Sequence, residues 1–428
     1  MTNYIGPDAI LQKKQEYLIP CVFHFYKKPM QIVRGKMQYL YDHTGKQYLD
    51  FYGGVSVMNA GHCNEEIVEK VCEQMRTLQH TTTIYLTQPI VDLAEKLAHI
   101  TPGHLKRSFF CASGSEANDG AALLAQLHTK KPKFVAVQQG LHGRTRFTMN
   151  LTGIPMWRTD IFPSNDVAHI PAAYCYRCAY GLSYPACDLR CAQQLEDVVK
   201  CGDCAAFIVE PIQGNGGIIT PPHGYFNRVR EILDKYGTLL ITDEVQTGFG
   251  RTGRMFAIDH WDVVPDIMTM AKGIANGTPL GAFTTGDAIA SSYTRPGAST
   301  TGGNPISATA ALATINFIEK QQLTWKAKEL GGYFKERLVE LQARHSTIGE
   351  VRGKGLMIGV ELVKENKIPA TEETDFIIEE FKNRGVLAGK TGMSRNVLTF
   401  QPPLVITRND IDHVVETLDK VLFMAESR

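Results

Sequence analysis

The sequence lacks a long apolar run, an excess of charge of one sign and any stretch of low complexity. No run of apolar residues approaches the ~20 that a membrane-spanning helix needs. Lys and Arg number 45 against 44 Asp and Glu, so the net charge is +1. A chain with that balance has no global basic field to attract nucleic acid. We therefore expect neither a membrane protein nor a nucleic-acid-binding protein.

The start of the chain also lacks a basic region followed by an apolar one, which a secretory signal would need. We therefore expect a cytoplasmic protein. Apolar residues make up 43% of the sequence and charged residues 21%, as is typical of a soluble globular protein. A chain of 428 residues can bury a large core and is long enough to divide into two unequal domains.

Cysteine is more frequent than we expect in a cytoplasmic enzyme. Six of the ten cysteines fall within thirty residues, namely Cys175, Cys178, Cys187, Cys191, Cys201 and Cys204. Two of the spacings are C-x-x-C, which is found in zinc and redox sites. No histidine joins these pairs, so we expect a reduced, structured insertion over about residues 174–204 and no bound metal, with zinc as the alternative. Disulfides are disfavoured in a reducing compartment.

The middle of the chain alternates apolar strand-like segments with amphipathic helical ones. Such alternation is typical of a parallel sheet covered by helices on both faces. Before about residue 59 the pattern instead predicts short strands and turns. A helix is predicted from residue 65, after the N-cap Asn64. The remaining predicted helices of this part span residues 91–99, 115–128 and 225–236, and the predicted strands span 109–112, 134–137, 206–210 and 238–243.

After residue 305 the pattern changes to longer helices with a single strand-like segment at 356–361. The predicted helices span residues 306–319, 323–344, 372–383 and 409–426. This suits a smaller α+β domain built from the C-terminal third and packed with the N-terminal strands. The predicted division is therefore 1–59 (small domain), 60–305 (large domain) and 306–428 (small domain).

A carboxylate and a lysine stand out within the large domain. Asp243 ends the apolar run of Ile241-Thr-Asp-Glu-Val-Gln-Thr-Gly-Phe-Gly250, and Lys272 follows 29 positions later in Met270-Ala-Lys-Gly-Ile. Pyridoxal phosphate (PLP) needs such a pair: a lysine amine forms a Schiff base with its aldehyde, and a carboxylate keeps its pyridine nitrogen protonated. The pair predicts PLP as the cofactor and leaves the reaction open.

A third segment, Ser113-Gly-Ser-Glu-Ala-Asn118, lies between a predicted strand and a predicted helix. The free N–H groups and the dipole at a helix N-terminus attract anions, and glycine lets a phosphate approach closely. Gly-Ser turns open many helices, so the segment is weak evidence alone. Because it precedes Asp243 and Lys272 in the expected order, we predict that Gly114 and Ser115 bind the cofactor phosphate.

Taken together, these segments resemble the class III aminotransferases of the fold type I PLP enzymes. Two further stretches, 174–181 and 351–359, are similar to the alanine–glyoxylate aminotransferase 2-like branch. The resemblance covers nearly the whole chain and implies an α/β fold, with a mainly parallel seven-stranded sheet in the large domain and a smaller α+β domain. Its motifs are Ser-Gly-Ser-Glu-Ala-Asn (113–118), His-Gly-Arg-Thr (142–145), Glu-Pro-Ile-Gln-Gly (210–214), Thr-Asp-Glu-Val-Gln-Thr-Gly-Phe-Gly-Arg-Thr-Gly (242–253), Met-Ala-Lys-Gly-Ile (270–274) and Thr-Thr-Gly-Gly-Asn-Pro (300–305).

The resemblance implies a role for each matching residue. Lys272 would carry the Schiff base and shuttle the proton, and Asp243 would pair with the pyridine nitrogen. Gln246 would contact the ring hydroxyl, and Val245 would pack on one ring face. Thr300 would reach the cofactor phosphate of a neighbouring subunit, which implies a homodimer with shared active sites. Glu210 would lie near the substrate.

Two positions depart from the family pattern. Leu141 stands where the family usually stacks an aromatic ring on the cofactor, a preference of about 0.5–1.5 kcal/mol. Thr399 stands where the branch usually has an arginine that binds the substrate α-carboxylate, and a hydroxyl cannot replace its charge. The loss argues against ordinary transamination unless Arg395 or another base compensates.

The C-terminal segment around Thr399 also resembles that of the PLP-dependent phospho-lyases of this family, which release an aldehyde and ammonia. We therefore expect a lyase acting on a small primary amine, an aminoalkyl phosphonate or phosphate, with Arg144 and Arg146 as first candidates for its anionic group. The alternative is an aminotransferase that moves an amino group from an ω- or β-amino donor to pyruvate, glyoxylate or 2-oxoglutarate. A third reading, a scaffold with the PLP fold, conflicts with the presence of Lys272, Asp243 and Gln246 together.

Overall fold

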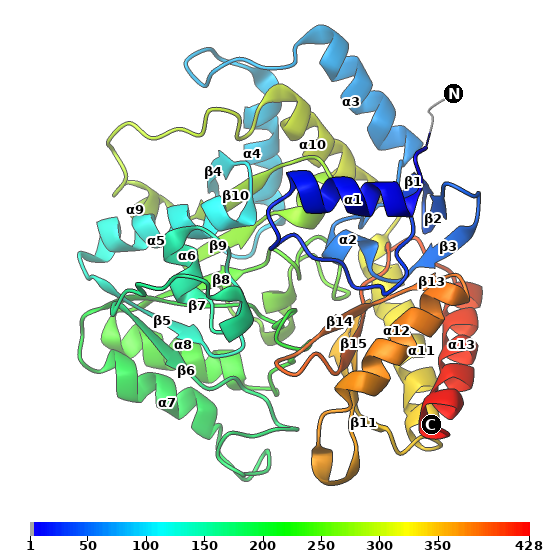
Figure 1. The fold of residues 1–428 in the computed structure, drawn as a ribbon. Coiled ribbons are helices and arrows are strands. Elements are labelled where there is room, and N and C mark those ends of the chain that lie inside the picture. Colours follow the sequence, from blue (N-terminus) through cyan, green and yellow to red (C-terminus); the bar gives the residue numbers. More distant parts are fainter. Residues whose placement is uncertain (1–3) are drawn as a thin grey trace.

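The computed structural model describes residues 4–428, so the first three residues, part of the stretch on which the expected absence of a secretory signal rests, lie outside it. Its centre is a seven-stranded sheet in the order β4-β10-β9-β8-β7-β5-β6 (Figure 1). Strand β10 is antiparallel to both β4 and β9, and the other neighbours are parallel, which confirms the predicted mainly parallel sheet. The strands are β4 (Arg107–Cys111), β5 (Lys133–Val137), β6 (Val167–Ile170), β7 (Cys204–Val209), β8 (Leu239–Asp243), β9 (Ile267–Met270) and β10 (Gly281–Thr285).

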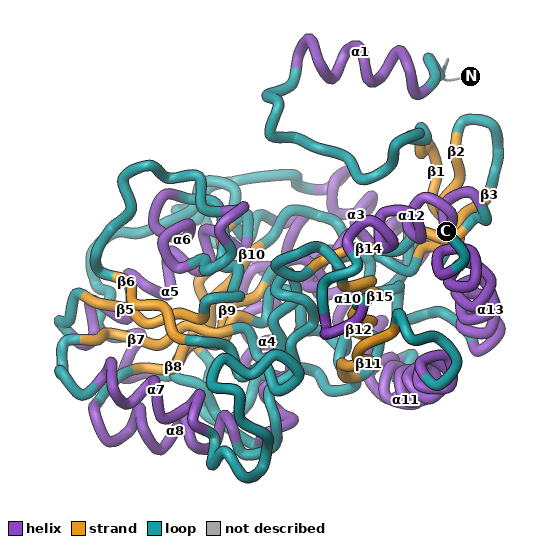
Figure 2. Tube along the Cα trace, turned by 60° about the horizontal axis from the view of Figure 1, so that its bottom comes forward, coloured by secondary structure: helices purple, strands orange, loops and turns teal. Residues whose placement is uncertain are grey.

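Helices cover both faces of this sheet, because successive side chains of a strand point to opposite faces. Phe134 and Ala136 of β5 pack with helix α5, whereas Val135 and Val137 pack with α7 and α8. Figure 2 shows α5 and α6 on one side of the strands and α7 and α8 on the other. The helices of this part of the chain are α2 (Gly53–Ser56), α3 (Glu65–Thr77), α4 (Gln88–Ile100), α5 (Gly114–Thr129), α6 (Arg146–Leu151), α7 (Arg190–Val199), α8 (Tyr225–Tyr236) and α9 (Asp287–Ala290).

Two smaller sheets lie beside the large one. The first joins the N-terminal strands to β13 in the order β1-β2-β3-β13, and the second runs β11-β12-β15-β14. The N-terminal strands therefore pair with a C-terminal strand, as the proposed small domain requires. These strands are β1 (Ile32–Lys36), β2 (Tyr39–Asp42), β3 (Gln47–Asp50), β11 (Ile348–Lys354), β12 (Met357–Leu362), β13 (Val386–Leu387), β14 (Gly389–Thr391) and β15 (Val397–Phe400).

The four predicted helices after residue 305 all form. They are α10 (Pro305–Lys320), α11 (Leu323–Gln342), α12 (Thr371–Asn383) and α13 (Arg408–Glu426). Helix α10 packs on α3 and α4, whereas α11, α12 and α13 contact one another or the second small sheet. The first helix after residue 305 thus remains attached to elements of the large domain. No helix within residues 4–428 is both long and apolar enough to cross a bilayer.

The N-terminal prediction of only strands and turns missed the short helix α2 and a longer helix before β1. Pro7–Tyr17 forms helix α1, and none of its residues is buried. Figure 2 shows α1 standing apart from the rest of the chain. A helix without a buried face carries no apolar stripe for the sequence pattern to reveal. Proline at its first position nevertheless fits a helix start.

Candidate active site

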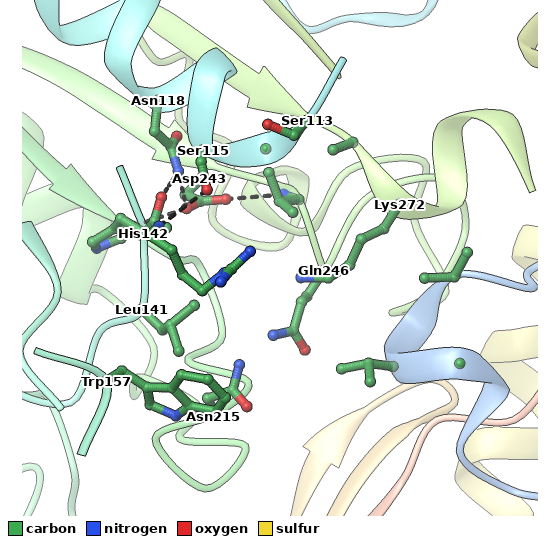
Figure 3. Close-up of a pocket in the computed structure, with 18 of the residues that line it drawn as sticks. Ser113, Ser115, Asn118, Leu141, His142, Trp157, Asn215, Asp243, Gln246 and Lys272 are labelled. Atoms are coloured by element: carbon green, nitrogen blue, oxygen red, sulfur yellow. Dashed lines mark hydrogen bonds and ion pairs between the residues drawn. The ribbon is translucent and has the colours of Figure 1, made fainter. Parts of the chain in front are cut away.

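A cavity of about 630 Å³ opens at one edge of the large sheet, beyond the carboxyl ends of β8 and β9. Ligand sites of open α/β sheets form at this edge, because the loops that leave parallel strands gather there. The cavity brings together Lys272, Asp243, the N-terminus of α5 and the loop after β5, together with part of the segment between β14 and β15. Residues far apart in the sequence therefore share one wall (Figure 3).

Asp243 is the last residue of β8, and three groups orient its carboxylate. Asn118 Nδ2 donates to Oδ2 at 2.8 Å, and the Nδ1–H of His142 donates to the same oxygen at 2.8 Å. The backbone N–H of Val245 donates to Oδ1 at 3.1 Å. Figure 3 shows the His142 and Asn118 side chains converging on this carboxylate. Such a network fixes the direction in which the acid presents its remaining lone pairs.

Lys272 follows β9 and opens the 3-10 helix η3 (Lys272–Ala275). Its φ of 48° lies in the left-handed region, which is sparsely populated by residues with a Cβ and is often used at functional sites. Burial lowers the pKa of its amine, and the nearby Asp243 and Glu210 carboxylates oppose the shift. A lowered pKa leaves more of the amine neutral, the form that attacks a carbonyl.

The start of α5 forms another wall of the cavity. Ser113 is the N-cap, and its side chain accepts from the N–H of Glu116 at 3.3 Å. Gly114 and Ser115 follow at the cavity wall. A Cβ on Gly114 would lie 3.0 Å from Val245 Cγ1, so a side chain there would push against Val245. This helix end therefore offers an anion site next to the Asp243 loop.

Glu210 and Gln246 occupy the floor of the cavity. Glu210 accepts hydrogen bonds from the N–H groups of Leu141 at 2.9 Å and Gly214 at 3.0 Å. Burial raises the pKa of Glu210 to about 7 despite these bonds. Gln246 Oε1 accepts from Gln401 Nε2 at 3.2 Å, and a Cβ on Gly214 would lie 2.4 Å from that oxygen. The glycine thus leaves room for the Gln246 amide.

This set of groups fits PLP. An amine of lowered pKa, an oriented carboxylate and a helix N-terminus surround one cavity, with Leu141 and Val245 as its apolar walls. These are the groups that a cofactor with an aldehyde, a pyridine nitrogen and a phosphate requires. Leu141 lines the cavity as the sequence predicts, with an aliphatic side chain in place of an aromatic ring.

The candidate substrate residues divide into two groups. Arg144, Glu210 and Arg395 line the cavity, whereas Arg146 and Thr399 do not. Thr300, predicted to bind the cofactor phosphate of a partner, does not line it either. Arg146 Nε pairs with Asp160 at 3.3 Å, and its side chain is 77% exposed. Thr300 lies exposed in the loop before α10, so a contact with a partner's cofactor stays a prediction.

Thr399 is fully buried, and its hydroxyl lies 2.6 Å from that of Thr391. The position usually occupied by the arginine of the branch is therefore a packing position here. Arg395 instead presents a half-buried guanidinium, which lies 5.2 Å from the ring centre of Phe25 and 5.8 Å from that of Phe23. Within residues 4–428 it has no carboxylate within ion-pair distance, and burial lowers its pKa.

Several residues of the site carry no role in the sequence prediction. Asn118 and His142 stand inside quoted motifs, but nothing in the spacing shows that both contact Asp243. Phe23, Phe25 and Trp157 form an aromatic wall beside Arg395, with Phe23 6.0 Å from Trp157 between ring centres. The aromatic pair Phe-x-Phe, in a segment without regular structure, was the only available signal.

Comparison with known proteins decides the family. The family model described as Aminotransferase class-III matches residues 24–422. The chain belongs to the class III aminotransferases. Their cofactor is PLP, so the predicted cofactor and enzyme class are confirmed. Among relatives of this class III enzyme is the Arabidopsis thaliana protein named alanine–glyoxylate aminotransferase 2 homolog 2, mitochondrial, which is 45% identical over 97% of this chain and 88% of that protein.

Solved structures agree with the class III fold. A Bacillus anthracis aminotransferase matches with a TM-score of 0.90 and 32% identity, covering 97% of this chain and 98% of that one. A phospholyase from Arthrobacter in complex with phosphoethanolamine matches with a TM-score of 0.89 and 30% identity, covering 97% and 99%. Both the lyase and the aminotransferase readings thus have structural neighbours, while the sequence relatives favour the aminotransferase.

Proposed function

We propose that this enzyme is an aminotransferase that moves an amino group from an ω- or β-amino donor to a small 2-oxo acid, with pyruvate, glyoxylate and 2-oxoglutarate as candidate acceptors. Because of Thr399 we expected a lyase, with an aminotransferase as the alternative. The proposal now places the aminotransferase first. The observation that carries it is Arg395, a half-buried cation on the cavity wall without an ion-pair partner among residues 4–428. A guanidinium in that state favours an anionic ligand, a carboxylate or a phosphate, which it can bind through two parallel hydrogen bonds. Relatives named as aminotransferases, such as the Arabidopsis protein, favour the carboxylate.

Each residue of the cavity then has a task. When bound, PLP supplies an aldehyde that takes up the amino group and a ring that accepts the electrons of the broken C–H bond. The Nζ of Lys272 would take the proton from the amine-bearing carbon and pass it to the former aldehyde carbon within the same half-reaction, and the second half-reaction would run this transfer in reverse. Asp243, oriented by His142 and Asn118, would keep the ring nitrogen protonated. Gly114 and Ser115 would hold the phosphate and Gln246 the ring hydroxyl, while Leu141 and Val245 would enclose the ring.

The substrate end is formed by Arg395 and the aromatic wall. The carboxylate of each substrate in turn would pair with Arg395, while Phe23, Phe25 and Trp157 exclude water around it. Exclusion of water strengthens a charged pair. Arg144, which also lines the cavity, is the second candidate for a distal anionic group of the donor.

A homodimer belongs to the same proposal. Thr300 lies on an exposed loop outside this chain's cavity. Its role as a phosphate ligand therefore requires a second copy of the chain. The cytoplasmic location stays a prediction, and the Arabidopsis relative is named as mitochondrial.

The test is a substrate panel with purified holoenzyme. Alanine, β-alanine and longer ω-amino acids are supplied with and without pyruvate, glyoxylate or 2-oxoglutarate, beside phosphoethanolamine and an aminoalkyl phosphonate. We expect turnover only when an oxo acid is present, with formation of the matching amino acid. Ammonia and aldehyde released without an acceptor would overturn the proposal in favour of the lyase. The Lys272→Ala variant is the control for chemistry outside this site.

A further inference from the structure

The cysteine-rich segment divides into two groups in space. Cys175, Cys178, Cys187 and Cys191 line one cavity of about 20 Å³. Cys201 and Cys204 lie beyond the far end of α7, a ten-residue helix about 15 Å long. The two C-x-x-C pairs noted in the sequence therefore do not face each other. The first pair instead meets Cys187 and Cys191.

The spacing of the four cavity cysteines suits a tetrahedral metal ion. They read C-x2-C followed by C-x3-C, and structural zinc sites pair ligands at such short spacings. All four are free thiols, and three of them are half-buried. A cavity of about 20 Å³ has room for a single small species, since one water needs roughly 10–15 Å³. The four thiols can therefore surround a single ion, and the space between them is too small for an organic ligand.

The cysteine-rich segment has no regular backbone structure, which favours stabilisation by a cross-link. Residues 171–189 form no helix or strand between β6 and α7. Structureless connections longer than about 12–15 residues are uncommon in compact domains. Its internal backbone hydrogen bonds close short turns at the cysteines, with Gly181 N donating to Cys178 O at 3.1 Å and Cys187 N to Ser183 O at 2.9 Å. Its other hydrogen bonds are further short turns and side-chain bonds to the rest of the chain, such as Tyr184 Oη to His223 O at 3.0 Å.

We propose that Cys175, Cys178, Cys187 and Cys191 bind one Zn²⁺ ion as four thiolates, and that this ion is structural. Binding displaces the four thiol protons and forms four zinc–sulfur bonds. The site replaces the initial expectation of a metal-free insertion. No three of these four sulfur atoms lie within 4.8 Å of one another, so side-chain rotation has to bring them together around the ion.

The other candidate trio is less suitable for a metal. Cys201, Asp203 and Cys204 have ligand atoms within 4.8 Å of one another. However, Lys133 Nζ already pairs with Asp203 at 2.7 Å, and this cation would repel a second one. The trio also comes from one short stretch, which runs from the exposed Cys201 to the buried Cys204 at the start of β7, and it offers only three ligands. It serves as a matched control, because it contains the same C-x-x-C spacing.

The zinc site would stabilise the junction between the two domains. Tyr174 and Arg177, next to the first cysteine pair, both hydrogen-bond Glu361 on β12. Arg352 links Glu361 to the large domain, with Nη1 2.7 Å from Glu361 Oε2 and Nη2 2.6 Å from Gly217 O. A fixed cysteine loop would hold this network in place.

The metal content of the purified enzyme tests the proposal. We expect about one zinc per chain in wild type, as in a closed four-thiolate site. The Cys175→Ser and Cys191→Ser variants should lose this zinc and unfold at a lower temperature. The Cys201→Ser variant, at an exposed position, should keep both the zinc and the wild-type unfolding temperature, and Cys204→Ser, a substitution in the core, should keep the zinc. Zinc that is lost in Cys201→Ser and kept in Cys175→Ser would overturn the assignment.

A second measurement does not depend on the variants folding. Reduced wild-type enzyme is supplied with Co²⁺, and the visible spectrum is recorded to the red of the cofactor band. Tetrahedral cobalt bound by thiolates gives strong d–d absorption there, which zinc should then displace. If wild type holds no zinc and reduced wild type gives no cobalt–thiolate spectrum, the loop has no metal site and the proposal fails.

Discussion

The imidazole of His142 lies with its Nδ1 2.8 Å from Oδ2 of Asp243. Its other ring nitrogen, Nε2, has no hydrogen-bond partner within the described residues. The histidine is completely enclosed beside the carboxylate. It therefore acts on the cofactor through Asp243, as a positioning residue.

We predict that the His142→Ala variant loses about 10- to 100-fold in kcat, because a hydrogen bond to a charged group contributes about 1.5–3 kcal/mol. Asn118 still donates to Asp243 at 2.8 Å, so the loss should stay below that of Asp243→Ala. The measurements are kcat and the absorption band of bound cofactor. A His142→Asn variant, which keeps a donor, should recover part of the activity. An unchanged kcat in a folded His142→Ala enzyme would contradict the role.

Arg395 and Thr399 give a matched pair for the carboxylate site. We predict that Arg395→Ala raises KM for oxo acids by at least tenfold, because it removes a charge-assisted contact that two parallel hydrogen bonds can form. Neutral amine donors should be little affected. Thr399→Val should leave KM unchanged and cost about 1 kcal/mol of stability, since it removes the hydrogen bond to Thr391 and a long one, at 3.5 Å, to the Val397 carbonyl. Steady-state kinetics of both variants, with one acidic and one neutral donor, measures these effects.

The opposite kinetic result would move the carboxylate site from Arg395 to Thr399. If Thr399→Val raised KM and Arg395→Ala did not, the threonine would contact substrate after a conformational change. An Arg395→Lys variant adds a further check, because it keeps the charge and loses the planar fork. It should fall between wild type and Arg395→Ala.

Replacing Leu141 by an aromatic residue should strengthen the binding of the cofactor. An aromatic ring at this cavity wall can stack on the cofactor, and such pairs contribute about 0.5–1.5 kcal/mol. The Leu141→Phe variant should therefore bind PLP about 2- to 10-fold more tightly, measured as the cofactor Kd by titration of apoenzyme. The hydrogen bond from the backbone N–H of residue 141 to Glu210 does not depend on the side chain and is kept in Leu141→Phe. Weaker binding by a stably folded Leu141→Phe enzyme would show that the wall has no room for a ring.

Much of the fold follows from residue patterns alone. Strands β4, β5, β7 and β8 and the helix at Tyr225–Tyr236 were predicted with bounds close to the observed ones, because buried strands read as continuous apolar runs. Strands β6, β9 and β10 were not predicted. Helix α1 was missed because none of its residues is buried. The pattern of a sequence records burial, so an element without a buried face leaves little trace.

The residues of the site likewise divide into those that the sequence predicts and those that it does not. Asp243, Lys272 and the Gly114–Ser115 turn were predictable, since PLP chemistry demands those groups and the strand ends bring them together. Thr399 was taken as the substrate position from its place in the sequence, but its pairing with Thr391 across β14 and β15 turns it inward. Arg395 reaches the cavity because a turn at positive φ intervenes before β15. Such turns depend on tertiary packing and cannot be inferred from spacing.

Because of Glu244, the stability of the folded protein should depend on pH. It is fully buried behind the cofactor loop, where Oε1 accepts from the Ile258 N–H at 2.8 Å and the other oxygen accepts from Thr247. Burial raises its pKa from 4.5 to about 7. Between these values the folded state binds more protons than the unfolded state, so stability falls as pH rises through the window. The full penalty is present above pH 7 and absent below about 4.5.

The Glu244→Gln variant keeps the shape and removes the charge. It should match wild type near pH 4.5 and become more stable than wild type as pH rises to 8, by up to about 3 kcal/mol. The measurement is the thermal midpoint of both proteins across this range. Glu210, with a pKa also raised to about 7, contributes the same slope to both proteins and cancels in the difference. A constant difference in midpoint from pH 4.5 to 8 would show that Glu244 titrates normally in the folded protein.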